Sequence, residues 1–491
     1  MGGALLGKLL GFLREIELAR LLGASFVADS FRGSLAAILL PIAPMQGDMI
    51  PSVMIPLHRQ WRAEGIAPAY FTSLMAVFAS ISLVITVLVW VFASSWVNVV
   101  VGGFGPEAHA MTVSFVRVMA LSMPATTVSA CMSCVEISVG RSRITTIRAS
   151  MSNVGIMIGI AVMAYTGQPL AIAWGYVIAF NLVVLFGSYK LWQEREVALH
   201  EIRFRNMKPA LRGFFTRMRP LFVQPFADQG TILLERYFGS TFSVGTLASL
   251  DYARTLTETA LYLVSQPIGY VVLAQAPGSS DTVRGRVLAL SRPLLGLAMP
   301  AALFLCVFAP DIVSVVFQRG VFQQHAVQLT SSALRGISAG LWASTLGWIL
   351  IRMINAAGRN GAAARVIVSS YAANSVVNCL LWLFAGVGVM GLGLGESARG
   401  LMTLAGAALV LGCGGLIAGQ ILRLLPGLLI MLAAGVLIRY QVEVPWLRLG
   451  LGAPVFGAGI CVLLRPELKT LYRRARDKRR ARKRPAFAAG A

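Results

Sequence analysis

Charged side chains are concentrated near the start of the chain, within an otherwise apolar stretch. Arg14, Glu17 and Arg20 recur at steps of three, so a helix would place them on roughly one face, where their alternating signs allow pairing. Asp29 and Arg32 repeat this spacing. A charge in hydrocarbon costs about 2.5–3.5 kcal/mol even on lenient insertion scales. We therefore expect these side chains to line a water-filled cavity or to pair within a bundle; charges that reach the interface from a shallow first helix are the alternative.

A second group of charges lies near the middle of the chain. Asp251, Arg254 and Glu258 are spaced i, i+3, i+7 and so share one helical face, with Arg254 between two carboxylates. Such an arginine can bind an anionic head group, and a neutralised structural ion network is the alternative, because buried ion pairs are weak evidence for either role. Asp228, Glu235 and Arg236 belong to the same cluster. Single charges in other apolar segments are weaker candidates for a site, and several of them fit positions at the membrane interface: Arg117, Arg335, Arg352, Glu396 and Arg399.

The sequence lacks the common motifs of catalysis and cofactor binding. It contains no GxxxxGK[ST], GxSxG or HExxH pattern, and its four histidines lie far apart in or beside polar links. Cys131 and Cys134 form a lone CxxC in an apolar segment, which is typical of structural cysteines. We expect no enzyme, no cofactor and no metal site. Transport would then draw on an ion gradient or on the membrane potential, which supplies about 2.3 kcal/mol per charge per 100 mV.

The composition is that of a polytopic membrane protein. Of 491 residues, 57% are hydrophobic and 13% are charged, with a mean hydropathy of +0.73, whereas soluble domains carry about 25% charged residues. The net charge of +23 is expected to collect in cytoplasmic loops rather than to bind nucleic acid. The basic tail over 473–484 is expected to contact anionic membrane lipid, with nucleic acid as the alternative.

The apolar segments alternate with two kinds of link. Links rich in arginine and lysine, which mark the cytoplasmic side, alternate with links poor in them. The exceptions are 317–320 and Arg439 with Arg448, all on expected outer links. A span needs about 20 mainly apolar residues, and fourteen spans, an even number, place both termini in the cytoplasm. The predicted spans are 2–22, 30–56, 69–98, 109–136, 144–165, 168–191, 219–239, 243–273, 287–317, 326–355, 362–385, 387–412, 416–438 and 449–464.

The longest polar link divides the predicted spans into two sets. We expect an all-α membrane protein with about fourteen helices, in two six-helix lobes around a central cavity plus two C-terminal helices, because paired lobes are a common transporter plan. The expected parts are an N-terminal lobe over 1–193, a cytoplasmic linker over 194–218, a C-terminal lobe over 219–412, two further helices over 413–464, and a basic cytoplasmic tail over 465–491.

Three segments resemble one family of transporters. KLLGFLREIELARLLGASFVADSF is similar to SRxLGFxRDxxxAxxFGAGxxxDAF, the opening of the MurJ/MviN lipid II flippases. SLDYARTLTETALYLVSQPIGYVVL and the segment VFQRGVFQQHAVQLTSSALRGISAGLWASTLGWILIRMINAAGRNGAAARV resemble two later motifs of that family. The resemblance covers most of the chain. It implies fourteen helices, two lobes with an alternating cavity, a bacterial cytoplasmic (inner) membrane, and cargo on an undecaprenyl pyrophosphate carrier.

The resemblance also implies site residues. The family's cavity arginine after GF corresponds to Arg14, its aspartate before AF to Asp29, and its arginine before LGF to Lys8, which keeps the charge but lacks the bidentate guanidinium. The expected substrate-binding residues combine these positions with the charged faces described above: Lys8, Arg14, Asp29, Arg32, Asp251, Arg254 and Glu258.

Other family positions differ in this chain. The family's paired arginines of its LPNLLRRxFAEG segment fall near Ile42 and Ala43, so both are missing. Its YADRL arginine aligns with Thr255, and Arg254 stands one position earlier, which is about 100° around a helix. Arg254 replaces it only if that helix adjusts. The chain also begins later than the family's opening, as a shortened gene model would.

The expected function is a flippase for an undecaprenyl-pyrophosphate-linked saccharide, a lipid II-like peptidoglycan precursor. A flippase for an exopolysaccharide or other surface-glycan repeat unit is the alternative, because that cargo keeps the carrier and changes the sugar contacts. A cation-coupled drug exporter and a silent scaffold of an envelope-synthesis complex are further classes; both leave the positive charges at Lys8, Arg14 and Arg254 unexplained.

Substitution tests the assignment of Arg14 and Asp29 to the cavity. Arg14→Ala and Asp29→Ala, each at normal membrane abundance, are expected to abolish cargo translocation, because each removes a charge that this assignment places beside the cargo. Translocation in cells carrying only the variant gene measures this. Full activity in both variants would contradict the assignment.

Overall fold

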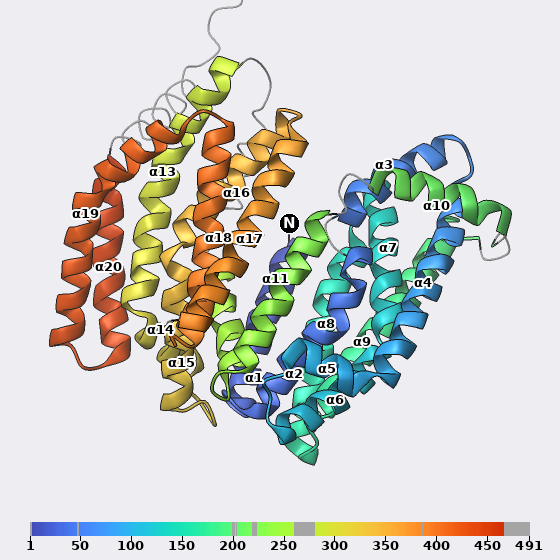
Figure 1. The fold of residues 1–491 in the computed structure, drawn as a ribbon, viewed down its shortest axis with the longest axis horizontal. Coiled ribbons are helices and arrows are strands. Elements are labelled where there is room, and N and C mark those ends of the chain that lie inside the picture. Colours follow the sequence, from blue (N-terminus) through green and yellow to red (C-terminus); the bar gives the residue numbers. More distant parts are fainter. Residues whose placement is uncertain are drawn as a thin grey trace, which may run out of the picture.

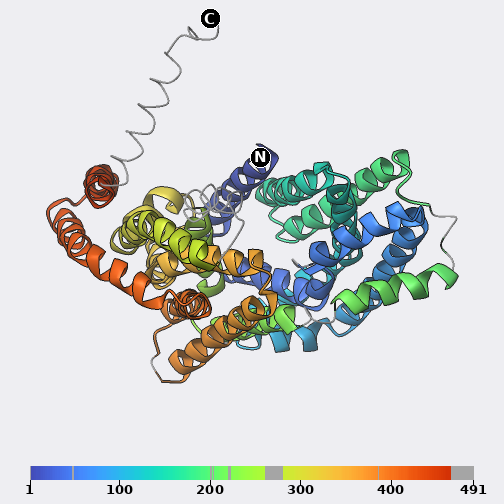
Figure 2. The same ribbon diagram turned by 90° about the horizontal axis from the view of Figure 1, so that it is seen from above.

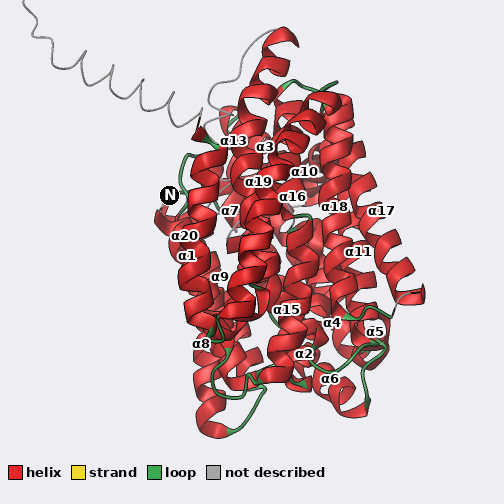
Figure 3. Cartoon of the chain, turned by 90° about the vertical axis from the view of Figure 1, so that its left-hand side faces the viewer, coloured by secondary structure: helices red, strands yellow, loops and turns green. Residues whose placement is uncertain are grey.

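The chain folds into a bundle of long helices. A computed structural model describes residues 2–46, 49–198, 202, 204–218, 223–259, 280–384 and 386–465. Every regular element in these ranges is a helix, as the colouring of Figure 3 shows, which confirms the predicted all-α class. The helices form two groups beside each other, and α19 and α20 lie at the outer edge of the second group (Figures 1 and 2).

The first group contains the N-terminal helices. The second predicted span is broken by prolines: the short 3-10 helix η1 carries Pro41 and Pro44 and separates two α-helices. Ser25 caps the first of these, its hydroxyl accepting a hydrogen bond from the Ala28 N–H. The elements are α1 (Gly2–Leu22), α2 (Phe26–Leu39), η1 (Leu40–Met45), α3 (Met49–Ala63), α4 (Ala67–Val91), α5 (Ala93–Val101), α6 (Pro106–Ala120), α7 (Met123–Ser138), α8 (Arg143–Thr166) and α9 (Ala171–Gln193).

The second group follows a connecting segment that is itself helical. This segment, α10 (Phe204–Met218), buries Ala210, Phe214 and Met218 in a core shared with α3 and α4, and leaves Lys208 and Arg212 exposed. The later elements are α11 (Val223–Ser240), a helix over 246–259, α13 (Ser280–Val307), α14 (Ala309–Phe317), α15 (Gln324–Ala339), α16 (Leu341–Ala356), α17 (Asn360–Phe384), α18 (Val389–Val410), α19 (Gly414–Gln441) and α20 (Pro445–Leu463).

Eight described helices are long and apolar enough to cross a membrane. Two bent pairs, α6 with α7 (48°) and α15 with α16 (45°), raise this number to ten if each pair is one span. The positions of the described helices agree with the predicted spans, but the number of fourteen spans stays a prediction. Part of the predicted span over 243–273 and the basic tail after residue 465 lie outside the described residues.

The predicted outer arginines near the C-terminal helices have a buried partner. Asp311 of α14 is 1% exposed; its carboxylate accepts a hydrogen bond from Arg448 Nη1 at 2.9 Å and faces Arg439 Nε at 3.4 Å. Two of the arginines that break the alternation of basic links, Arg439 and Arg448, therefore hold α19 and α20 against the second group.

The two helix groups meet closely at the end opposite the basic links. The Asp29 carboxylate of α2 accepts hydrogen bonds from the Gly245 N–H at 2.6 Å and the Ala248 N–H at 2.8 Å, at the start of the helix over 246–259. Gly103 donates its N–H to Ser240 Oγ at 2.9 Å, and a Cβ at Gly103 would lie 2.6 Å from the Thr241 nitrogen. We call this region the closing contact.

Glycines also set the packing of α8 on α9. A Cβ added at Gly155 would lie 2.5 Å from the Ala179 Cβ, so the two backbones approach as closely as small residues allow. Such approaches are a main source of helix association in membranes, where apolar side chains gain nothing by leaving lipid.

Gly155→Ala is expected to destabilise the protein, because overpacking costs about 1–3 kcal/mol. Thermal unfolding of the purified chain in detergent, followed by tryptophan fluorescence, should show a melting temperature lower by several degrees. Gly457→Ala is the matched control: it lies within α20, and an added Cβ meets no atom within 4 Å. Equal melting temperatures for the two variants would contradict the close-packing argument.

Candidate functional site

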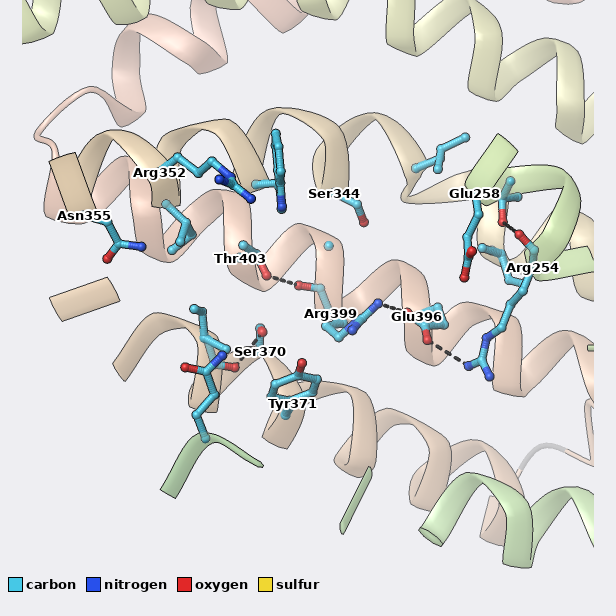
Figure 4. Close-up of a pocket in the computed structure, with 18 of the residues that line it drawn as sticks. Arg254, Glu258, Ser344, Arg352, Asn355, Ser370, Tyr371, Glu396, Arg399 and Thr403 are labelled. Carbon is cyan, nitrogen blue, oxygen red and sulfur yellow. Dashed lines mark hydrogen bonds and ion pairs between the residues drawn. The ribbon is translucent and has the colours of Figure 1, made fainter. Parts of the chain in front are cut away.

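A cavity of about 800 Å³ lies mainly within the second helix group. Its walls come from α15 to α18, α11 and the helix over 246–259, and Pro51 and Ser52 of α3 add a contribution from the first group. Hydroxyl and amide groups of Ser344, Asn355 and Thr403 also line it. Its charged lining residues, shown in Figure 4, are Arg254, Glu258, Arg352, Glu396 and Arg399.

Helix α18 can present charges to this cavity because glycines bring it close to its neighbours. A Cβ at Gly395 would lie 2.6 Å from Asn374 Oδ1 of α17, and one at Gly400 would lie 3.0 Å from the Ser344 nitrogen of α16. Glu396 and Arg399, at i and i+3, lie beside these glycines and line the cavity.

Glu396 bridges two arginines. Its Oε1 accepts from Arg254 Nη2 at 2.8 Å, and its Oε2 lies 2.6 Å from Arg399 Nη2. Arg254 is held from its other side by the buried Glu235, through Nη1 to Oε1 at 2.8 Å and a second short bond from Nη2. The Arg399 guanidinium lies 5.6 Å from the centre of the Tyr371 ring.

The ion pairs continue from this cavity toward the first helix group. Asp251 contacts Arg254 Nη1 at 3.7 Å, accepts from Arg236 Nη2 at 2.8 Å and lies 3.6 Å from Arg32 Nε. Arg32 donates to the buried Glu15, with one bond of 3.2 Å and a shorter one.

The network ends on α8. Glu15 also accepts a short bond from Arg14, whose Nη1 donates to Asn153 Oδ1 at 2.9 Å. Five arginines alternate with four carboxylates along the whole chain of contacts, so the network is nearly neutral: Arg14, Arg32, Arg236, Arg254 and Arg399 with Glu15, Asp251, Glu235 and Glu396.

The predicted site residues divide into three sets. Arg254 and Glu258 line the cavity, and Lys8 Nζ lies 3.4 Å from Glu258 Oε2. Arg14, Arg32 and Asp251 belong to the ion network. Asp29 lies apart, 3% exposed in the closing contact, where it caps the helix over 246–259.

The sequence makes Arg352, Glu396 and Arg399 weaker candidates, and the structure places all three on the cavity wall. The i, i+3 spacing of Glu396 and Arg399 is the signal that also singles out Asp251 and Arg254. The Arg352 guanidinium lies 4.1 Å from the ring centre of Trp348, one helical turn before it.

Comparison with known proteins identifies a family that matches most of this chain. Residues 18–446 match the family described as lipid II flippase MurJ. A probable lipid II flippase MurJ of Rhizobium tropici is 24% identical over 82% of this chain and 77% of its own length. One of Aquifex aeolicus (strain VF5) is 21% identical over 68% of this chain and 66% of its own length. The chain thus spans about two thirds to three quarters of these relatives.

Solved structures share the fold. A lipid II flippase MurJ in an inward closed conformation has a TM-score of 0.81 at 17% identity, over 95% of this chain and 98% of its own. An inward-facing multidrug resistance MATE family transporter has a TM-score of 0.65 at 14% identity, over 84% of this chain and 95% of its own.

Glu15→Gln is expected to destabilise the protein strongly, because removing one partner of a buried ion pair costs about 3–5 kcal/mol. Of its two carboxylate partners, Arg32 would keep the longer contact, with Asp251. Glu17→Gln, on the same helix, is the control: Glu17 and Arg20 are both exposed, and such pairs contribute about 0–1 kcal/mol. Melting temperatures in detergent measure the difference, and a similar small change in both variants would contradict the role of the network.

Proposed function

The chain belongs to the lipid II flippase MurJ family, and we propose that it moves an undecaprenyl-pyrophosphate-linked saccharide, a lipid II-like peptidoglycan precursor, across the bacterial cytoplasmic membrane. Transport from the inner to the outer face would occur by alternating access, without covalent chemistry. The observation that carries this proposal is the cavity in which Arg254 and Arg399 share one carboxylate.

The cavity lining supports an anionic, sugar-bearing cargo. Three arginines and two glutamates line it, which leaves one net positive charge. Guanidinium groups suit phosphate because they form two parallel hydrogen bonds with it. The hydroxyl and amide side chains of Ser344, Ser370, Asn355 and Thr403 can bind sugar hydroxyls.

The closing contact supports alternation between two open states. It holds the two helix groups together at one end through few, specific hydrogen bonds, so opening at that end requires Asp29 to leave the helix over 246–259. The basic links lie at the opposite end, which we assign to the cytoplasm together with both termini. An ion gradient or the membrane potential would supply the energy.

One observation favours a different cargo on the same carrier. Ile42, near the position of the family's paired arginines, is fully buried in the apolar core. The first helix group therefore offers no cation there to a head group, and a flippase for an exopolysaccharide or other surface-glycan repeat unit is the second candidate.

Rescue of cells depleted of their lipid II flippase tests the function. The wild-type gene should restore growth, and Arg254→Ala at equal membrane abundance should lower translocation by about tenfold or more, because it leaves Glu235 and Glu396 without their shared cation. Arg117→Ala is the control, since the Arg117 guanidinium packs on Trp90 and does not line the cavity.

The outcomes separate the two cargoes. No rescue by the wild-type gene, together with loss of a surface polysaccharide when the gene is deleted, would favour the repeat unit. Full activity of Arg254→Ala would contradict the assignment of the cavity.

A further inference from the structure

Glu396 holds the cavity arginines in the way that a phosphate group would. Each of its two oxygens takes one guanidinium, from Arg254 at 2.8 Å and from Arg399 at 2.6 Å (Figure 4). Phosphate groups bind arginines through the same geometry, with separate oxygens and charge-assisted bonds of this length. A phosphate at this position and the Glu396 carboxylate would therefore exclude each other.

Glu396 can move away from Arg254 and Arg399 without leaving either guanidinium both buried and unpaired. Arg254 keeps its two bonds to Glu235, and the Arg399 side chain is 37% exposed and lies against Tyr371. The Glu396 side chain itself is 16% exposed and borders the cavity. The bridge is thus a contact that can open, unlike the Glu15–Arg32 pair, in which both side chains are buried.

Arg352 offers a second place for negative charge in the same cavity. It packs on Trp348, and among the described residues no carboxylate lies within 4.0 Å of its guanidinium. In Figure 4, Arg352 lies above Thr403, one helical turn of α18 beyond Arg399. Arg352 thus adds positive charge to the cavity at a place separate from the bridge.

We infer that Glu396 is a displaceable internal ligand: it occupies the site of a substrate phosphate between Arg254 and Arg399. This inference rests on the proposed function and assigns the bridge to a phosphate group of the lipid carrier. A tethered carboxylate competes at a high effective concentration, so it raises the affinity that any anion must reach to enter. It also closes the bridge again when the cargo leaves, which favours release.

Binding to the purified full-length chain in detergent tests the inference. The probes are farnesyl-diphospho-N-acetylglucosamine and farnesyl-phospho-N-acetylglucosamine, which differ by one phosphate group, and their Kd values are measured by calorimetry. Glu396→Gln is expected to tighten binding of both probes by about tenfold or more, because it removes the competitor.

Glu258→Gln tests whether a change in the general electrostatic potential of the cavity is enough to change binding. It removes the same charge from the same wall, but Glu258 contacts Lys8 rather than the bridged arginines. Its gain in affinity for both probes should be at least about threefold smaller than that of Glu396→Gln, because an exposed charge is screened by solvent and salt. Glu396→Asp, which keeps the charge but shortens the reach, should shift both Kd values in the same direction as Glu396→Gln and covers the case in which the latter fails to fold.

The possible results separate the two proposals. Weaker binding of the probes by Glu396→Gln would show that Glu396 only positions the arginines. Equal increases in affinity for Glu396→Gln and Glu258→Gln would show an effect of the general electrostatic potential. Either result would overturn the proposal of an internal ligand without contradicting the flippase function. If the wild-type chain binds neither probe, the cavity assignment and the internal ligand are both overturned.

Discussion

The free-energy cost of an unpaired charge in hydrocarbon constrains how the charged residues at the centre of this molecule are arranged. Five arginines project from apolar helices, and each has a carboxylate within ion-pair distance. The pairs connect α1, α2, α11, the helix over 246–259 and α18 into one network. Because each ion satisfies its neighbours, a movement of one helix group relative to the other must exchange partners within the network rather than expose a charge to lipid.

The network differs in character along its length. At Glu15 and Arg32 both side chains are buried, which suits a fixed joint, and at Arg399 the guanidinium is partly exposed to the cavity. A transporter needs both properties, since the frame must persist while the cargo contacts form and break. The gradient from buried to exposed pairs places the exchangeable contacts on the second helix group.

The sequence predicted the positions of the helices and part of the cavity lining. Apolar length predicted where the helices lie, because it acts within one segment. It identified Arg254 and Glu258 from their shared helical face. It did not place Glu396 beside Arg254, because the two residues are joined by contact across 142 residues of sequence, and it did not predict that Asp29 binds backbone amides. Such long-range partners depend on the packing of the helices, which no local spacing encodes.

The two sides of the closing contact differ in how easily a mutation can remove their hydrogen bonds. On one side the acceptor is the Asp29 side chain, which most substitutions remove, and on the other side the donors are the main-chain N–H groups of Gly245 and Ala248. Within the helix over 246–259 only proline can delete such a donor, whereas Gly245, just before it, has a positive φ and no room for a Cβ beside Ala24. Drift in that helix therefore leaves these bonds intact, and selection for a looser or tighter gate must act on the aspartate or on the packing around it.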